Sequence, residues 1–309
     1  MAHLDLFNHL VNGEWETFGI GRETIVPIAI RNAETAPYLM YELLALSAQH
    51  LNLVSPVQEE HYKNQEMRLQ TRAISLFNAA IAREEISSDN CLPFFVFSSS
   101  LGTHQFCNVV RNSEGDFKTF ISSLVNSLGL YQGLRAVVGS NWHTLSDFSE
   151  IRPILDAGKD ALVGFLEDEN YQLRETESKS LVRLLDDPLD HLNSTAVEAN
   201  RQAINLFDCL LNYHRDKKPD ENKFRGVFGW PALVKKEFQD QLVHLSPKSL
   251  IILAHYAVLL HYHRQLWLLR DGGKSLIDSI CQNIDDYWMR WLQWPSREIS
   301  RDIEMTDNE

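Results

Sequence analysis

The stretch from Lys248 to Leu269 restricts the fold of this chain more than any other part of it. It contains the run LIILAHYAVLLHYHRQLWLL, which predicts a strongly apolar helix. Pro247 stands just before this helix, where proline is favoured at a first turn. Gly272 and Gly273 follow it, and we interpret them as a helix C-cap.

Helical patterns also dominate the rest of the chain. Residues 38–53 are rich in leucine, and residues 59–83 form a long amphipathic stretch. The apolar side of that stretch consists of Met67, Ile74, Leu76, Phe77, Ala80 and Ile81. Strict alternation of apolar and polar residues is absent, so no strand is predicted. We therefore expect a single all-α domain over residues 1–296, with a polar tail over 297–309. Within this domain, we interpret residues 167–180 and 214–226 as charged surface connections.

Charge and cysteine content exclude several classes of function. The chain has 29 Lys and Arg against 42 Asp and Glu, a formal charge of −13, which opposes binding to phosphate backbones. The apolar stretch 91–110 is interrupted by serine, threonine, histidine and asparagine, which favours a buried helix over a membrane span. The four cysteines are widely spaced and predict no metal site, and we expect a cytoplasmic or nuclear protein.

Several separated blocks resemble a known family. In the second half these blocks are VFGWPALVKKEF, SPKSLIILAHYAVLLHYHRQLWLLRDGGKSLIDSI and WMRWLQWP. In the first half they are HLDLFNH, ELLALSAQHL and LGLYQGLRAVVGSNWHTL. Together they are similar to the C-terminal regulatory domain of fungal zinc-cluster transcription regulators of the sterol-uptake control type, over about residues 3–295.

This resemblance implies an all-α bundle, often dimeric, that encloses an apolar pocket for a sterol or a similar lipid. It also implies a ligand-responsive regulator, although we find no DNA-binding module in this chain. An alternative is a stand-alone enzyme of fungal secondary metabolism, a cyclase or isomerase that acts without a cofactor on a polyketide-like or terpenoid-like substrate. A purely structural or partner-binding role is a third hypothesis.

Two apolar helices carry the candidate ligand-binding residues, because a lipid pocket needs an apolar lining with a few polar anchors. The candidates are Phe95, Ser99, Thr103, His104, Phe106, Tyr256, Leu260, His263 and Trp267. The last four recur at helical spacing and could form one stripe, although such a stripe also suits ordinary helix packing. Core packing is an equally open interpretation of the aromatic residues between 94 and 106.

If the chain were an enzyme, histidines would be the first candidates for acid–base catalysis. These are His104, His143, His255 and His263. His143 precedes Asp147 by four residues, which could orient its ring, but no nucleophile is evident beside it. His261 and His263 point to opposite sides of a helix and cannot chelate one metal together, so the sequence predicts no metal ligand.

Overall fold

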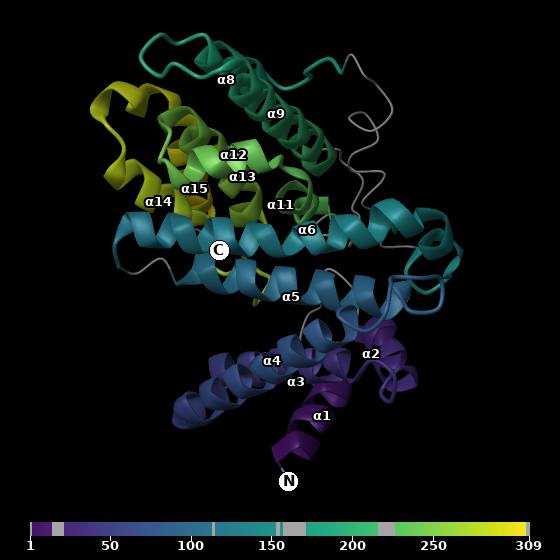
Figure 1. Ribbon diagram of the computed structural model, residues 1–309. Coiled ribbons are helices and arrows are strands. Elements are labelled where there is room, and N and C mark those ends of the chain that lie inside the picture. The colour runs from purple at the N-terminus through teal and green to yellow at the C-terminus, as the bar shows by residue number, and fades with distance from the viewer. Residues whose placement is uncertain are drawn as a thin grey trace. The chain divides into compact units, whose positions relative to one another are not determined.

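A computed structural model describes residues 2–13, 22–112, 115–152, 155–156, 171–215 and 226–306 (Figure 1). Every regular element in these ranges is a helix, and they contain no strand, which confirms the all-α fold class. The apolar pocket stays a prediction. No single described helix is long and apolar enough to cross a membrane, although the pair 236–243 and 247–262, bent by 109°, has the length and composition to do so.

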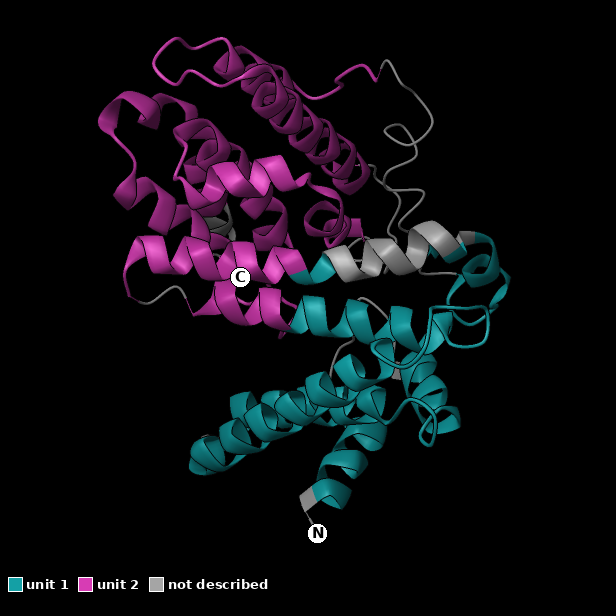
Figure 2. Cartoon of the chain, viewed as in Figure 1, with its two compact units in different colours: residues 1–104, 130–155 teal, residues 105–129, 156–309 magenta. Residues whose placement is uncertain are grey.

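The chain divides into two compact units, shown in Figure 2. Unit 1 comprises residues 1–104 and 130–155, and unit 2 comprises residues 105–129 and 156–309. The divisions at 104/105 and 129/130 fall inside helices α5 (Cys91–Arg111) and α6 (Phe117–Asp147). Neither unit is therefore continuous in sequence.

Helix α3 is the central element of unit 1. Helix α3 spans Pro37–Val54. The other helices wholly within unit 1 are α1 (Ala2–Asn12), α2 (Arg22–Arg31), η1 (Pro56–Gln58) and α4 (Glu59–Ile81). α3 packs against α1, α2 and α4, and every residue from Glu42 to His50 is buried. Its pattern is apolar almost all round, as expected for a helix enclosed by others.

Helix α4 buries only part of its apolar side. Leu69 and Ala73 are its buried residues, whereas Met67 is 59% exposed and Ile81 is 48% exposed. Because α4 lies along one side of α3, an apolar band wider than that contact remains partly in solvent.

Helix α13 is the corresponding central element of unit 2. Helix α13 spans Pro247–Tyr262. The other described helices wholly within unit 2 are α8 (Thr176–Leu185), α9 (Ser194–Arg215), α11 (Gly229–Leu233), α12 (Lys236–Val243), α14 (Gly272–Asn283), η2 (Asp286–Trp291) and α15 (Gln293–Thr306). Every residue of α13 from Lys248 to His261 is buried. The ammonium of Lys248 donates to the carbonyl oxygens of Leu185 and Asp187, at 2.8 and 2.7 Å.

Helix α13 ends earlier than predicted, at Tyr262 instead of Leu269. The following residues form successive turns in which the N–H of His263 donates to Leu260 and that of Leu266 donates to His263. His263 and Trp267 therefore do not continue the helical stripe of Tyr256 and Leu260. Arg270 has a φ of 42°, which reverses the chain just before α14.

The two glycines at 272–273 begin α14 and are not a C-cap of α13. A Cβ atom on Gly273 would lie 2.5 Å from the backbone nitrogen of His261 and 2.6 Å from the carbonyl oxygen of Ala257. Glycine is thus required here because two helix backbones touch. At the other end of unit 2, the expected boundary at residue 296 falls inside α15, which continues to Thr306.

Candidate functional site

The nine predicted ligand-binding residues are shared between the two units. Phe95, Ser99, Thr103 and His104 lie on the part of α5 that belongs to unit 1. The other five, which are Phe106, Tyr256, Leu260, His263 and Trp267, belong to unit 2. A ligand site common to both groups remains a prediction.

A buried charged cluster surrounds His104 in unit 1. The Nδ1 atom of His104 lies 2.8 Å from Oε1 of Glu42 on α3, and the Nε2 atom lies 3.1 Å from Oε1 of Glu66 on α4. The amide nitrogen of Gln70 is 3.0 Å from the same Nδ1. Three helices therefore meet at one imidazole, and both of its ring nitrogens face carboxylates.

This arrangement favours the charged form of His104. Burial alone would lower the pKa of His104, but the charges and hydrogen bonds of Glu42 and Glu66 outweigh burial and raise it to about 9. An imidazolium with both N–H groups donating to carboxylates cannot accept a proton. The second carboxylate oxygen of Glu42 is buried and has no hydrogen-bond partner among the described groups. The cluster thus ties α3, α4 and α5 together, and a ligand could reach His104 only by displacing a carboxylate.

The neighbouring candidates on α5 are engaged in packing. Phe95 is buried, and Ser99 and Thr103 are half-buried. The hydroxyl of Tyr131 donates to Oγ1 of Thr103 at 3.2 Å. A Cβ atom on Gly102 would lie 3.0 Å from the Tyr131 ring, so glycine allows that ring to lie against α5.

An aromatic cluster occupies the middle of unit 2. The rings of Trp230 and Tyr256 stack with centroids 4.2 Å apart, and Phe106 and Phe238 approach the same pair. The hydroxyl of Tyr256 donates to the carbonyl of Val227, and Leu260 is fully buried. The aromatic rings contact one another and the hydroxyl is satisfied internally, as in a packed core.

His255 is a neutral histidine in the core of unit 2. Its Nδ1 lies 2.8 Å from the carbonyl oxygen of Ile251, and its ring stacks on Trp294 and meets Phe207 edge-on. Burial lowers the pKa of His255 to about 4, despite the nearby carboxylate of Glu177. Since Nδ1 must donate to the carbonyl, Nε2 is the acceptor of this ring.

The remaining candidates lie away from these clusters. His263 packs edge-on against His214, whose ring stacks on Tyr262, and Trp267 is half-buried after the end of α13. His143 is exposed on α6 and forms no hydrogen bond with Asp147. The four histidines considered for catalysis are distributed over both units. Among the described residues, no group of three or more His, Cys, Asp or Glu is arranged to hold a metal ion.

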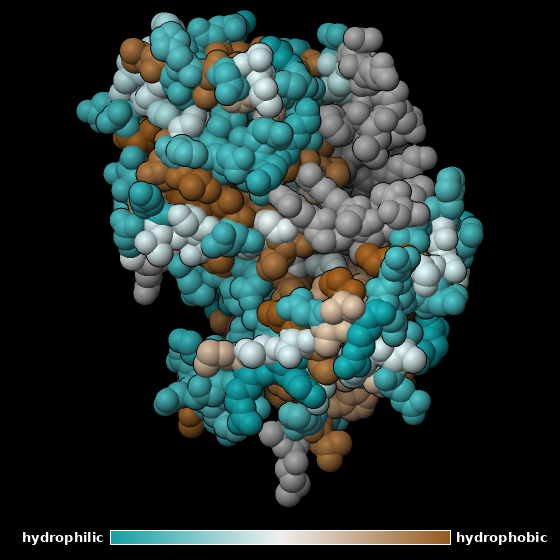
Figure 3. Space-filling model, in the orientation of Figure 1, coloured by the Kyte–Doolittle hydropathy of each residue, from teal (hydrophilic) through white to brown (hydrophobic). Residues whose placement is uncertain are grey.

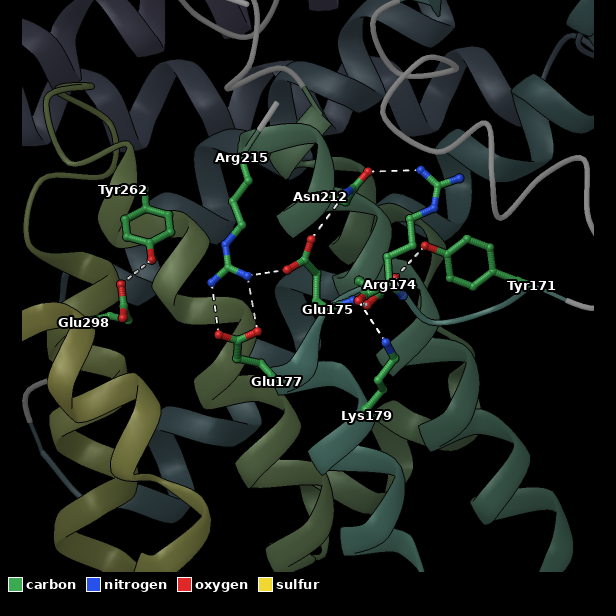
Figure 4. Close-up of polar contacts among 10 residues, drawn as sticks. Tyr171, Arg174, Glu175, Glu177, Lys179, Asn212, Arg215, Tyr262 and Glu298 are labelled. Atoms are coloured by element: carbon green, nitrogen blue, oxygen red, sulfur yellow. Dashed lines mark hydrogen bonds and ion pairs between the residues drawn. The ribbon is translucent and has the colours of Figure 1, made fainter. Parts of the chain in front are cut away.

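A polar network that was not predicted from the sequence surrounds the buried carboxylate of Asp208 on α9, and Figure 4 shows part of it. Asp208 accepts hydrogen bonds from the hydroxyl of Tyr171 at 2.6 Å and from the backbone N–H groups of Arg174 and Glu175 at 3.0 and 2.9 Å. These N–H groups precede α8, where a carboxylate stabilises the start of a helix. An acid inside the otherwise apolar run LFDCLL was the available signal.

Arg215 extends this network at the end of α9. Its guanidinium pairs with the carboxylates of Glu175 and Glu177 on either side of the α8 start (Figure 4). Burial raises the pKa of Glu177, but the hydrogen bond from Arg215 outweighs it and the net effect is a lowered pKa. Asn212 bridges Arg174 and Glu175. The start of α8, expected to be a surface connection, is thus fixed to α9 by three side chains of α9, those of Asp208, Asn212 and Arg215.

Comparison with known proteins supports the regulator interpretation at the level of the family. A family model described as "Fungal specific transcription factor domain" matches residues 17–101, which include α2, α3, α4 and the start of α5. A protein of Gibberella zeae named "Zn(2)-C6 fungal-type transcription factor" is 20% identical over 269 residues. The match covers 84% of this chain and 52% of that protein, so the chain spans about half the length of its relative. The chain is therefore similar to transcription regulators of the fungal type.

Proposed function

We propose that this chain is a regulatory region of a fungal zinc-cluster type transcription regulator that responds to a hydrophobic small molecule of the sterol or terpenoid kind. The observation that carries the proposal is the family match over α2 to α5, together with a zinc-cluster relative aligned along 84% of the chain. Such a protein acts in the nucleus or the cytoplasm. The sterol-uptake type is the finer part of the proposal and rests on the sequence blocks.

The helical arrangement of unit 2 is compatible with sensing an apolar ligand. Helix α13 is buried from Lys248 to His261, contacts α8, α9, α12, α14 and α15, and carries a polar group, His255, that stays neutral in the core. A neutral imidazole can exchange a hydrogen bond with a ligand hydroxyl at lower desolvation cost than a charged group. Homodimerisation is a further part of the proposal. The described residues provide no observation that favours the enzyme alternative, and we assign no reaction.

A reporter assay tests the regulatory role directly. The full chain is fused to an unrelated DNA-binding domain in a fungal host, and reporter expression is measured with and without an inhibitor of sterol synthesis. A regulatory region is expected to change reporter output on sterol depletion. An output identical to that of the DNA-binding domain alone, under both conditions, would contradict the proposal.

Ligand binding is tested separately on purified protein. Organic extraction followed by mass spectrometry identifies a co-purified lipid, and titration with ergosterol measures its affinity. Trp267→Ala is expected to weaken binding, while Trp291→Ala, at another half-buried tryptophan of unit 2, serves as the matched control. Equal affinities for the two variants would remove Trp267 from the ligand site without affecting the reporter result.

A further inference from the structure

The solvent-facing side of α4 combines an apolar edge with a basic edge. Met67, Ile74 and Ile81 are seven residues apart, which places them on one side of the helix. Met67 and Ile81 are 59% and 48% exposed, and Ile74 is half-buried. A row of apolar side chains is therefore open to solvent along about 20 Å of helix, at 1.5 Å per residue.

The opposite edge of this exposed side is positively charged. Arg68 and Arg72 are four residues apart, on one side of α4, and both are exposed. Neither forms an ion pair with a described residue. Small polar residues, Thr71 and Ser75, lie between the two edges and are exposed as well. We name Met67, Arg68, Thr71, Arg72, Ser75 and Ile81 the α4 face.

The charge of the α4 face is opposite to that of the chain as a whole. The chain carries a formal charge of −13, and most of the surface drawn in Figure 3 is hydrophilic. Between Lys63 and Ile81, however, the single acid is Glu66, which turns inward to His104. The exposed charges on this part of α4 are thus all positive. Unpaired arginines beside exposed apolar residues are typical of a binding surface.

We propose that the α4 face binds an acidic amphipathic helix of a partner protein. Carboxylates spaced four residues apart on such a helix match Arg68 and Arg72, and guanidinium groups bind carboxylates with two parallel hydrogen bonds. The apolar side of the partner covers Met67 and Ile81, and Thr71 and Ser75 permit close approach of the two helices. This surface is separate from the ligand response proposed above.

Two other occupants fit the charges less well. A second copy placed symmetrically on this face would bring arginines against arginines, which is unfavourable. A nucleic acid would meet two arginines on a chain whose total charge repels a polyanion, whereas a short acidic segment carries far fewer charges. Charge complementarity therefore favours the acidic helix.

Fluorescence anisotropy with synthetic peptides tests the proposal on the full chain. The probe is a labelled helical peptide of about 20 residues, with leucine every seventh position and glutamates four residues apart; its control has glutamine for glutamate. Binding is measured at low and high salt, because exposed ion pairs weaken as salt screens them. A labelled DNA duplex tests for binding of a nucleic acid, and sedimentation analysis tests for binding of a second copy of the chain.

The glutamate peptide is expected to bind the wild-type chain, and the glutamine peptide to bind about tenfold more weakly. Arg68→Glu combined with Arg72→Glu should weaken binding by about tenfold or more. Arg201→Glu combined with Lys236→Glu is the matched control, because it removes two exposed cations of unit 2 and changes the net charge equally. Met67→Ser combined with Ile81→Ser should weaken binding at both salt concentrations.

Four results would overturn the proposal. The glutamate peptide could fail to bind the wild-type chain, or the two charge-reversal proteins could bind it equally. Tighter binding of the DNA duplex, lost on reversal of Arg68 and Arg72, would assign the face to nucleic acid. A dimer that dissociates on the same reversal would assign it to a second copy. Circular dichroism and thermal unfolding of each variant verify that the helix content and the stability of the wild-type chain are retained.

Discussion

The Nδ1 atom of His104 lies 2.8 Å from a carboxylate oxygen of Glu42, and both side chains are inaccessible to solvent. The two residues are 62 positions apart in the chain and join α5 to α3. Because a buried charge without its partner is costly, this pair makes the packing of unit 1 dependent on protonation.

Loss of the His104 charge should destabilise the protein at high pH. The pKa of His104 is raised from 6.5 to about 9 in the folded state, so its contribution is complete below pH 6.5 and is lost as pH rises through 9. Glu42→Gln should lower the free energy of unfolding by about 3 kcal/mol at pH 6.5 and reduce this alkaline loss. Urea denaturation at pH 6.5 and 9.5 measures both. An alkaline loss in Glu42→Gln as large as in wild type would contradict the assignment, and His143→Gln, at an exposed histidine, is the control.

His255 should have the opposite pH dependence. Its folded pKa is lowered to about 4, so the neutral form stabilises the fold above pH 6.5 and this stability is lost as pH falls towards 4. The loss amounts to about 3 kcal/mol, at 1.36 kcal/mol per pKa unit. His255→Gln should be less stable than wild type at pH 7 and should lose less stability between pH 7 and 4.5. Thermal unfolding measures this difference, and His244→Gln, on the surface, should keep the wild-type slope.

The Asp208 network should contribute strongly to the docking of α8 on α9. Asp208→Ala leaves the N–H groups of Arg174 and Glu175 and the hydroxyl of Tyr171 without their acceptor. We expect a loss of about 3 kcal/mol in the free energy of unfolding, at 1–3 kcal/mol for each buried donor left unsatisfied and with water reaching part of the site. Hydrogen exchange of α8 should also accelerate. If α8 kept its wild-type protection, the network would not hold this helix.

Gly273→Ala should be destabilising although alanine is the better helix former. The added Cβ would lie 2.6 Å or less from backbone atoms of α13, which cannot yield as a side-chain end would. A loss of about 1–3 kcal/mol is expected in chemical denaturation. The matched substitution is Gly129→Ala in α6, where a Cβ would meet nothing within 4 Å and about 1 kcal/mol should be gained. A gain in both variants would mean that α14 can shift away from α13.

The spacing of apolar residues predicted the helices well where most of the helix is buried. The apolar run that forms α13 identified the central helix of unit 2, and the leucine-rich stretch 38–53 identified α3. Helix ends were predicted less well. Gly273 was assigned to a C-cap because glycine commonly has that role, whereas here it permits contact between two backbones. Sequence patterns indicate which residues suit the interior and the ends of one helix, but not how closely another helix packs against it.

The candidate site was harder to predict for a related reason. His104 was selected for its position beside hydroxyl residues on one helix, but its partners Glu42 and Glu66 come from two other helices. Likewise, Arg215 and Glu177 are 38 residues apart. Ion pairs between distant segments have no characteristic spacing in the sequence. They can therefore be identified only once the packing of the helices is known. The exposure of Met67 and Ile81 could not be predicted either. Periodic apolar residues indicate which side of a helix is apolar, but not how much of that side a neighbouring helix covers.

The interruption of unit 1 by residues 105–129 has a consequence for synthesis on the ribosome. Residues 1–104 can form helices as they emerge, but the unit lacks residues 130–155 until a stretch belonging to unit 2 has also been made. A nascent chain that ends at residue 101, where the family match ends, therefore lacks the part of unit 1 that residues 130–155 form. Translation must reach residue 155 before unit 1 can close, so pausing or truncation before that point would leave apolar surface exposed to aggregation.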